Sequence, residues 1–509
     1  MDFDNWALSA AVFIPGIGAL VMLLIPRTEE TLLKTVALVT ALVTAAVGVY
    51  LLVQFDYDNA GVLQFTQDKE WIEVIRSRYI IGIDGISLPL LVLSMFVVVV
   101  CIIYSWDHIP EPGNPKALLM LILILEVGMN GTFVAQDLIL FFVFFEIVLL
   151  PMYFLIGVWG GEDRQYAAIK FFLYTLFGSA LMLLAFLALF FKTGAESFAI
   201  AYLAENAGDI VHSTQILIFG GMFIGFAVKV PIFPFHTWLP DAHTQAPTVG
   251  SVILAAILLK LGTYGFVRIA IPILPEAARD YAPWIGLLAV IGIIYGALCC
   301  LAQTDMKRLI AFSSVAHMGF VMLGISTLTD FGFNAAVFGM VAHGLITGML
   351  FFVAGSVKDR YHTLEIARLG GMLKQAPHIG WILGFCAMAS LGLPGLAGFW
   401  GEFPAILSAY NPASGLSEET FRTYMVIAAV GTVFAAGYLL WLLQRAAFGE
   451  PKEEFVHDGH IHDMGIYETI AWAPMLLLIV ALGVYPNLLF RVTDDAVQAA
   501  LATVNGIGA

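Results

Sequence analysis

The sequence predicts an all-α membrane protein that crosses the bilayer about fourteen times. The chain has 509 residues, of which 60% are hydrophobic and only 12% are charged. Apolar runs of about twenty residues, the length that a helix needs to span a bilayer, recur from end to end with short polar breaks between them. Two of these runs are interrupted by proline and glycine beside a charged residue, which is typical of transporters.

The apolar runs place each span to within a few residues. The first follows the acidic stretch MDFDNW and ends in PRTEE without a small-residue cleavage site, so we expect it to be retained as a helix. The expected spans are 7–25, 34–53, 84–105, 117–135, 138–159, 167–190, 216–239, 247–270, 283–302, 309–327, 334–355, 379–408, 423–447 and 469–489.

The seventh and twelfth spans contain the breaks. The seventh has Lys229 ahead of Pro231 and Pro234, and the twelfth has Pro394 ahead of Glu402. The breaks are five spans apart, and a unit with an odd number of spans must reappear upside down, so the sequence predicts two inverted five-helix units. The expected organisation is an N-terminal three-helix segment, two such units, and a loop with the last span: 1–116, 117–270, 283–447 and 448–509.

Two polar stretches are expected to lie outside the bilayer. The segment from Gln54 to Tyr79 alternates enough to predict a small outward hairpin that acts as a lid or contact surface. The segment SVKDRYHTLEIARLGGMLK is the longest basic loop, and we expect it at the cytoplasmic face against a partner.

The distribution of Lys and Arg over alternate loops predicts the orientation, because these residues favour the cytoplasmic side. One set of loops and span ends holds thirteen, namely Arg27, Lys34, Lys116, Arg164, Lys170, Lys307, Arg308, Lys358, Arg360, Arg368, Lys374, Arg445 and Lys452. The other set holds eight, namely Lys69, Arg76, Arg78, Lys192, Arg268, Arg279, Arg422 and Arg491. Both termini should therefore face outward, away from the cytoplasm.

Several functions are disfavoured by what the chain lacks. The net charge of −15 comes without any basic cluster that could neutralise phosphates, so no nucleic-acid partner is expected. We find no nucleotide-binding glycine loop, iron–sulfur cysteine frame or haem-attachment motif, and expect no cofactor in this chain. The cysteines are expected in the core or facing lipid: Cys101, Cys299, Cys300 and Cys386. The stretch HDGHIHD, with His457, His460 and His462, is interpreted as a solvated loop without a metal.

Few ionisable residues lie well inside the spans, and they are the candidate site: Glu126, Glu146, Lys229, Lys260, His317, His343 and Glu402. If Glu146, Lys229, Lys260 and Glu402 were charged and had neither a partner nor water to stabilise them, inserting them into the membrane would cost about 10–14 kcal/mol together. They must therefore be paired, hydrated or titrated. One interpretation is a set of structural ion pairs that lock helices together.

A second interpretation is proton transfer. A contact between Glu146 and Lys229 at about 4 Å is worth about 4 kcal/mol at an effective dielectric of 20, so making and breaking it could bind and release a proton. The histidines, with an ordinary pKa near 6.5, suit a relay from the lysines to Glu402, although each could equally be a neutral, hydrogen-bonded side chain. His236 and His243, just past the first break, and Glu126 are candidates for a secondary proton path.

Four stretches resemble a known family. FFEIVLLPMYFLIGVWG with Glu146, KVPIFPFHTWLPDAHTQAPTVGSVILAAILLK with Lys229 and Lys260, SSVAHMGF with His317, and LPGLAGFWGEF with Glu402 are similar to the antiporter-like membrane subunits of bacterial NADH:quinone oxidoreductase, respiratory complex I. The resemblance covers nearly the whole chain. Family members differ in the residue at the position of Glu402, and the resemblance indicates the branch that carries a carboxylate there, whereas other branches carry lysine.

The resemblance implies a role for each residue. Glu146 is the acidic partner, Lys229 the proton-carrying lysine and Lys260 the connecting lysine; His317 and His343 continue the line to Glu402, the end of the outward half-channel. It also implies partners: other membrane subunits, including neighbouring antiporter-like chains, and hydrophilic subunits that hold FMN and iron–sulfur clusters, with quinone at their junction.

Two alternatives stay open from the sequence. The large chains of multi-subunit sodium/proton antiporters resemble this one and share the glutamate and the lysines. A haem-bearing membrane oxidoreductase with histidine axial ligands would need paired histidines on facing helices, and the isolated chain would then show a Soret band.

Overall fold

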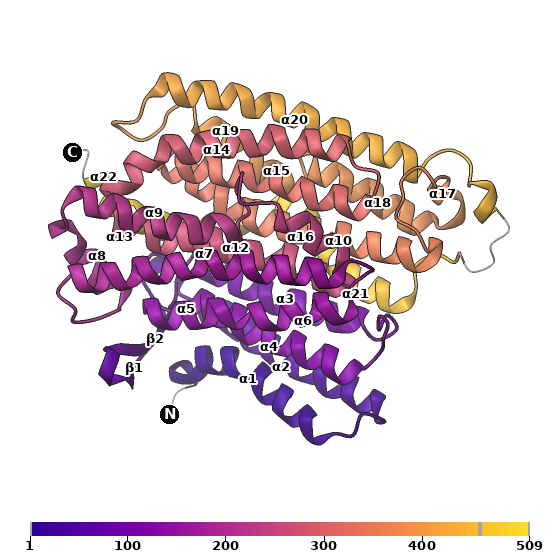
Figure 1. Ribbon diagram of the computed structural model, residues 1–509, viewed down its shortest axis with the longest axis horizontal. Helices are drawn as coiled ribbons and strands as arrows, with labels where there is room; N and C mark the ends of the chain where they lie inside the picture. The colour runs from indigo at the N-terminus through magenta and orange to yellow at the C-terminus, as the bar shows by residue number, and fades with distance from the viewer. Residues whose placement is uncertain (1–2, 457–460, 507–509) are drawn as a thin grey trace.

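The structure is a computed structural model that describes residues 3–456 and 461–506. Helices run side by side along the long axis of the molecule, with loops gathered at its two ends (Figure 1). Twelve helical runs in the described part of the chain are long and apolar enough to cross a membrane. The all-α membrane fold predicted from the sequence is therefore confirmed.

The N-terminal segment contains three of these helices and the hairpin that the sequence predicts. Its strands pair antiparallel with irregular register near both ends, and the hairpin lies at the left end of Figure 1. The elements are α1 (Asp4–Leu24), α2 (Glu30–Gln54), β1 (Gln64–Ile72), β2 (Ser77–Ile83) and α3 (Ser87–Tyr104).

The first predicted five-helix unit starts with α4 and is less regular than expected. The fifth span consists of two helices with a turn at Val148, and the eighth contains π-helical turns at Leu254–Leu258 and Phe266–Ala270. The helices are α4 (Pro115–Val134), α5 (Leu138–Ile147), α6 (Leu149–Trp159), α7 (Arg164–Lys192), α8 (Ile200–Asn206), α9 (His212–Lys229), α10 (Trp238–Gln245), α11 (Thr248–Ile253), α12 (Leu259–Gly265) and α13 (Ile271–Ile273).

The second predicted unit and the C-terminal part complete the chain. The helices are α14 (Pro275–Leu301), α15 (Met306–Ser326), α16 (Asp330–Tyr361), α17 (Met372–Gln375), α18 (Pro377–Ser390), α19 (Ala397–Ser408), α20 (Glu418–Ala446), α21 (Ile466–Val484) and α22 (Asn487–Gly506).

Both predicted breaks are present. The seventh span ends its first helix at Lys229, and α10 begins only at Trp238, since Pro231 and Pro234 have no N–H to continue the helical ladder. The twelfth span is split between α18 and α19, where Gly392 and Gly395 take positive φ angles of 79° and 94°. These are the two predicted spans outside the twelve long runs, so the count of fourteen stays a prediction.

Two expectations about the polar segments need correction. Helix α16 continues to Tyr361, so the first part of the predicted basic loop is helical, and Arg360 is buried rather than solvated. The last region also contains more than a loop and a span, because α22 follows the final span. Its inner face, which includes Thr493, Val497 and Leu501, is buried, and it packs on α13 and α16. The sequence interpretation missed it because its apolar residues alternate with polar ones and it is too polar to span.

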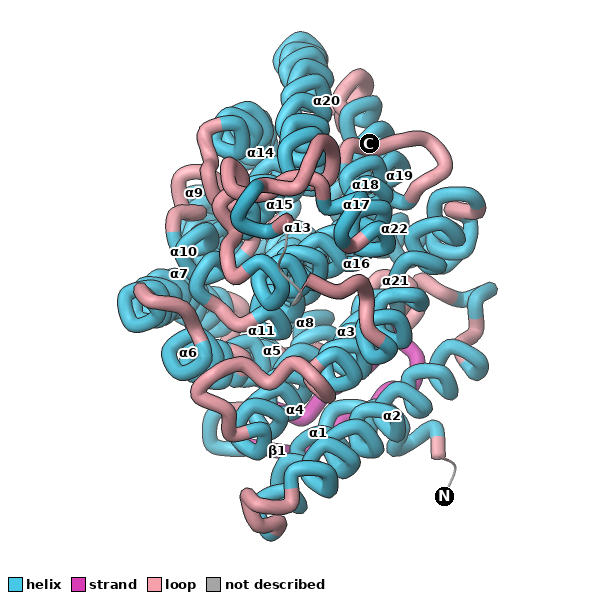
Figure 2. The backbone as a smooth tube through the Cα atoms, turned by 90° about the vertical axis from the view of Figure 1, so that its right-hand side faces the viewer, coloured by secondary structure: helices cyan, strands magenta, loops and turns pink. Residues whose placement is uncertain are grey.

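Helix α16 is the central element, with α1 and α2 at one side of the molecule and α14 and α20 at the other (Figure 2). Its most apolar stretch is 100% buried, against 39% in α2, α7 and α20. The other strongly buried runs are α15 and the span from Thr248 to Ile273, each at 94%. These three helical runs are therefore almost wholly enclosed by the rest of the chain.

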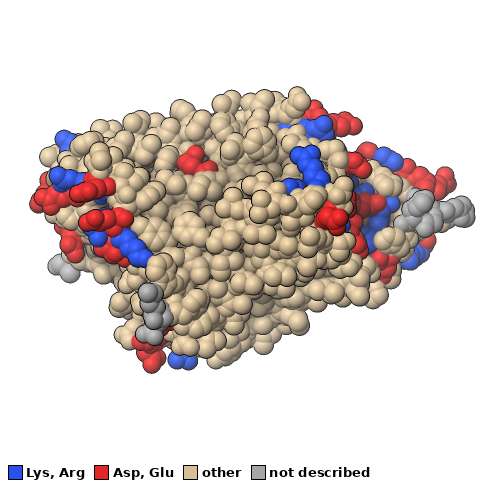
Figure 3. Space-filling view, turned by 90° about the horizontal axis from the view of Figure 1, so that it is seen from below, with Lys and Arg blue, Asp and Glu red and all other residues tan. Residues whose placement is uncertain are grey.

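Charged side chains gather at the two ends of the molecule and leave a broad uncharged band between them, broken on this face by one acidic patch (Figure 3). At the end with the larger cation set, Arg360 makes a bidentate pair with Glu468, both fully or nearly buried, with the shorter contact at 2.7 Å. This pair fastens α21 to α16. The band is the surface expected to face lipid and neighbouring chains.

The approach of α19 to α16 yields a test of packing. A Cβ at Gly401 would lie 2.5 Å from the Cα of Gly339, so Gly401→Ala forces the two helices apart. We expect the free energy of unfolding to fall by about 1–3 kcal/mol, measured as thermal stability in detergent. Gly437→Ala, in α20, is the matched control, because a Cβ there meets nothing within 4 Å and stability should not change. Equal effects of both substitutions would contradict this packing.

Candidate functional site

Lys229 lies at the last residue of α9, where the first broken helix ends. It is only 2% exposed, and its amine has no hydrogen-bond partner among the described residues. The amine lies 4.6 Å from the centre of the Phe145 ring, a favourable cation–π position, and the carbonyl end of a helix also favours a positive charge. The indole of Trp238 donates a 2.8 Å hydrogen bond to the Val228 carbonyl and so satisfies backbone freed by the break.

Glu146 stands near Lys229 but does not pair with it. It is half-buried near the end of α5, three residues before the start of α6, and it interacts electrostatically with Lys229. Both residues are described, yet no ion pair within 4.0 Å joins them. The direct contact of about 4 Å considered from the sequence is therefore not formed in this structure, because the amine lies over the neighbouring Phe145 ring instead.

Lys260 is fully buried on α12 and has defined partners. Its amine donates to the Ala255 carbonyl at 2.5 Å and lies 2.7 Å from Nδ1 of His343. The π-helical turn explains the first contact: the Leu259 N–H bonds to the Leu254 carbonyl, five residues back, which leaves the Ala255 carbonyl available. The irregular turn thus aims the amine toward α16.

The two lysines lie on helices that touch. A Cβ at Gly262 would be 2.8 Å from the Phe226 carbonyl and 3.1 Å from Cβ of Lys229, so only glycine permits this approach of α12 to α9. The structure therefore places Lys229 and Lys260 on adjacent helices, without a direct hydrogen bond between them.

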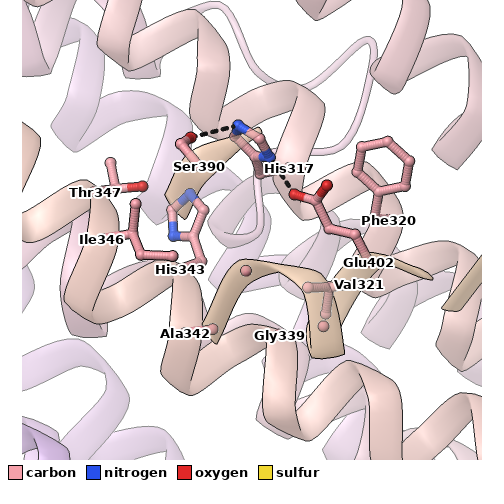
Figure 4. Close-up of a pocket in the computed structure, with 12 residues that line it drawn as sticks. His317, Phe320, Val321, Gly339, Ala342, His343, Ile346, Thr347, Ser390 and Glu402 are labelled. Carbon is pink, nitrogen blue, oxygen red and sulfur yellow. Dashed lines mark hydrogen bonds and ion pairs between the residues drawn. The ribbon is translucent and has the colours of Figure 1, made fainter. Parts of the chain in front are cut away.

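His317 and Glu402 form the far end of the site (Figure 4). Nδ1 of His317 lies 2.5 Å from Oε1 of Glu402, and its Nε2 lies 3.0 Å from the hydroxyls of both Ser390 and Tyr438. A carboxylate accepts, so Nδ1 carries the hydrogen in this arrangement and Nε2 is left for the two hydroxyls. The Glu402 side chain is 13% exposed and is the outermost member of the group.

A small cavity joins the two histidines. Their ring centres are 6.1 Å apart, and His317, His343 and Glu402 all line a cavity of about 20 Å³, with Thr347 and Ser390 on its wall (Figure 4). That volume holds about one water molecule. Nε2 of His343 has no protein partner in the described structure, so a water here would complete its hydrogen bonding. Lys260, His343, His317 and Glu402 thus form a nearly continuous buried line.

The three secondary candidates are not joined to this line by hydrogen bonds. Glu126 is fully buried on α4, and neither of its carboxyl oxygens has a partner among the residues described. His236 lies in the first break, with its ring against Phe233 and Tyr295. His243 is stacked on Phe351 at 4.4 Å, and both of its ring nitrogens lack a hydrogen-bond partner in the described part of the chain.

Sequence reasoning missed several residues that shape the site. Ser390 and Tyr438 contact His317, and nothing in their local sequence distinguishes them from other buried hydroxyls. Lys307 was counted among the orientation-setting cations, but it is buried, and its amine donates to the Ala246 carbonyl at 2.5 Å. The sequence signal for its burial was its place two residues after the helix-capping Asp305.

A carboxylate also holds the half-helix that follows the first break. Asp241 on α10 lies 2.6 Å from the Lys170 amine and 3.5 Å from Arg308. Because these cations come from α7 and α15, the contact ties α10 to both predicted units.

The structure describes all four cysteines but only part of the histidine-rich loop. All four cysteines are free thiols, with Cys299 half-buried and the others buried. His457 and His460 lie outside the described residues, and the carbonyl of His462 accepts a hydrogen bond from Arg360.

Comparison with known proteins identifies the family. Residues 135–429 match the family described as NADH:quinone oxidoreductase/Mrp antiporter, TM. NADH-quinone oxidoreductase subunit M of Rickettsia felis is 40% identical over 97% of this chain and 98% of its own length, and that of Rhodobacter capsulatus is 41% identical over 96% and 94%. The chain belongs to this family. NADH-ubiquinone oxidoreductase chain 4 of Arabidopsis thaliana is 39% identical over 94% of both chains.

Solved structures agree with this membership. A chain of respiratory complex I from Thermus thermophilus superposes with a TM-score of 0.86 at 27% identity, covering 98% of this chain and 99% of its own. A chain of the Mrp complex from a Dietzia species has the same fold, with a TM-score of 0.85 at 19% identity over 99% of this chain and all of its own. The antiporter-like family resemblance seen in the sequence is thus confirmed.

The one-water cavity yields a test of the buried line. Ala342→Val places two extra methyl groups on the wall of the cavity and should expel the water between His343 and Glu402. We expect proton transfer, followed as pH-indicator response in sealed membrane vesicles, to slow by roughly tenfold or more while the protein still assembles. Ala342→Ser, small and polar at the same position, is the control and should keep at least half of the rate. Equal rates in both variants would show that the cavity water plays no part.

Proposed function

We propose that the chain is a proton-translocating membrane subunit of an NADH:quinone oxidoreductase, driven by redox chemistry in partner subunits. The observation that carries this function is the buried line Lys260–His343–His317–Glu402, with contacts of 2.7 Å and 2.5 Å at its two ends and room for one water between. A structural ion-pair network would join opposite charges, whereas this line joins a base to two further bases before it reaches a carboxylate.

Lys229 acts as the switch in this proposal. Its amine has no hydrogen-bond partner in the described structure and stands near Glu146, so small movements can make or break their contact. Such a contact is worth about 4 kcal/mol at an effective dielectric of 20. Moving one charge against about 150 mV requires about 3.5 kcal/mol, so one contact made and broken matches the work of moving one proton.

Protons then pass along the buried line from Lys260 to Glu402. The Lys260 ammonium gives a proton to Nδ1 of His343, and His343 releases the proton on its Nε2 to water in the cavity. The water passes a proton to the His317–Glu402 pair, where Ser390 and Tyr438 stabilise either state of His317 because each hydroxyl can donate or accept. Glu402 is the terminal group of the outward path.

The proposal includes the organisation and placement of the chain. Residues 117–270 and 283–447 act as two inverted units, with 1–116 and 448–509 packed beside them. Both termini face the periplasm of a bacterial inner membrane, since the larger cation set lies on the opposite loops. FMN, iron–sulfur clusters and quinone are held by partner subunits, and neighbouring antiporter-like chains and lipids contact the apolar band.

A sodium/proton antiporter subunit is the second candidate function. The matched family description includes Mrp antiporters, and the Dietzia Mrp chain shares the fold. Identities near 40% over nearly full length to proteins named NADH-quinone oxidoreductase subunit M favour the first function.

The roles of Lys229 and Glu146 are tested by removing each side chain. We expect Lys229→Ala and, separately, Glu146→Ala to lower proton pumping by at least about tenfold in native membranes, because the switch loses its base or its acid. The complex should still assemble, with electron transfer slowed only through coupling. NADH oxidation and proton uptake are measured side by side.

Lys452→Gln, an exposed cation in the loop before α21, is the control for these variants and should pump normally. If the Lys229 and Glu146 variants move as many protons per electron as the unmodified protein, the assigned roles are wrong.

The transported ion separates the two candidate functions. We expect NADH-driven proton pumping by vesicles to stay unchanged when potassium replaces sodium in the medium, because the line holds nitrogen bases rather than an oxygen cage for a metal ion. Proton flux that requires sodium and proceeds without NADH would support the antiporter and overturn the first function.

A further inference from the structure

A groove opens on the surface where α1 and α6 end and α4 begins. Its volume is about 480 Å³, and it lies at the end of the molecule that carries the larger cation set. Among the residues that line it are two cations, Arg27 and Lys116, and no carboxylate. None of the residues that line the groove belongs to the buried proton line or to the other sites described above.

Within the described residues, neither cation forms an ion pair with a carboxylate of this chain. The Lys116 amine donates to the carbonyls of Leu23 and Ile25 at 2.9 Å and 2.7 Å, which caps the end of α1 and leaves one N–H free. Arg27 is exposed, and within the described residues it makes no side-chain hydrogen bond or ion pair. Other cations at this end do pair with carboxylates, among them Lys170, Arg360, Arg368 and Lys374.

Below the cations the groove is apolar. Side chains from three helices form its floor, including Leu23 on α1, Met120 on α4 and Phe154 on α6. Trp159, at the end of α6, donates a 2.6 Å hydrogen bond to the Gly113 carbonyl and stands at the rim. Tryptophan at a span end marks the headgroup level of a bilayer, so the floor lies at the depth of the acyl chains.

We propose that this groove binds one anionic diacyl phospholipid. Arg27 and Lys116 hold the headgroup phosphate, for which the planar guanidinium is well suited, and an acyl chain follows the floor between α1, α4 and α6. The charge of the rim selects an anionic headgroup, and the apolar floor requires a lipid rather than a free anion. The lipid would fill the junction between the N-terminal three-helix segment and α4–α6. Assignment to the cytoplasmic leaflet rests on the proposed orientation, whereas binding itself does not.

The test uses the assembled complex in membranes with two photoreactive lipids. Each carries a diazirine in its acyl chain, one with a phosphatidylglycerol and one with a phosphatidylcholine headgroup, and labelling of residues 117–124 is read by mass spectrometry of peptides. We expect phosphatidylglycerol to label this stretch roughly tenfold more than phosphatidylcholine.

Three variants separate the parts of the proposal. Arg27→Gln should reduce the preference for phosphatidylglycerol to less than half, and Ala117→Phe, which fills the groove without changing charge, should abolish labelling by both lipids. Arg445→Gln removes an exposed cation of α20 at the same end, which stands near Trp441 and does not line this groove, so labelling should not change.

Several outcomes would overturn the proposal. Equal labelling of the unmodified protein by the two lipids would remove the role of the cations. Labelling that inorganic phosphate suppresses at millimolar concentration would indicate an anion site without a lipid. Absence of lipid labelling, with a neighbouring subunit cross-linked to the same stretch, would show that protein occupies the groove. Pumping through Lys229 and Glu146 is independent of each of these results.

Discussion

A charged group inside this protein has no bulk water to stabilise it, and the rest of the structure depends on that constraint. A membrane helix cannot leave a charge or a backbone group unsatisfied without a cost of several kcal/mol. Here Lys260 is satisfied by a carbonyl that a π-helical turn leaves available and by the His343 ring. The irregular turn, often regarded as a defect, is what allows a lysine to remain fully buried.

The same constraint explains why the site lies on the most buried helices. Lys260, His343 and His317 lie on the three runs that are 94–100% buried, where neighbours on every side can supply partners. The outer helices, such as α2, α7 and α20, are only 39% buried and expose apolar side chains. Lys229 is different: its amine lies over an aromatic ring and lacks a hydrogen-bond partner among the described residues, which leaves it free to respond to Glu146.

The two broken helices serve the site in different ways. After Lys229, the chain is held by the Trp238 indole and by Asp241, which ties α10 to Lys170 and Arg308. In the second break, glycines at positive φ turn the chain, and a Cβ at Gly392 would lie 3.4 Å from Oε2 of Glu402. The first break therefore positions a base at a helix end, and the second provides space beside the terminal acid.

The sequence by itself determined the membrane fold, the positions of both breaks and the short set of buried ionisable residues, because insertion into lipid makes each charge costly and proline and glycine are easily recognised. The tertiary structure alone decided which of them touch. It joined Lys260 to His343 and His317 to Glu402, left Glu146 apart from Lys229, and added Ser390, Tyr438 and α22. These contacts depend on how helices distant in sequence pack and turn. That packing cannot be read from hydropathy and residue spacing along one chain.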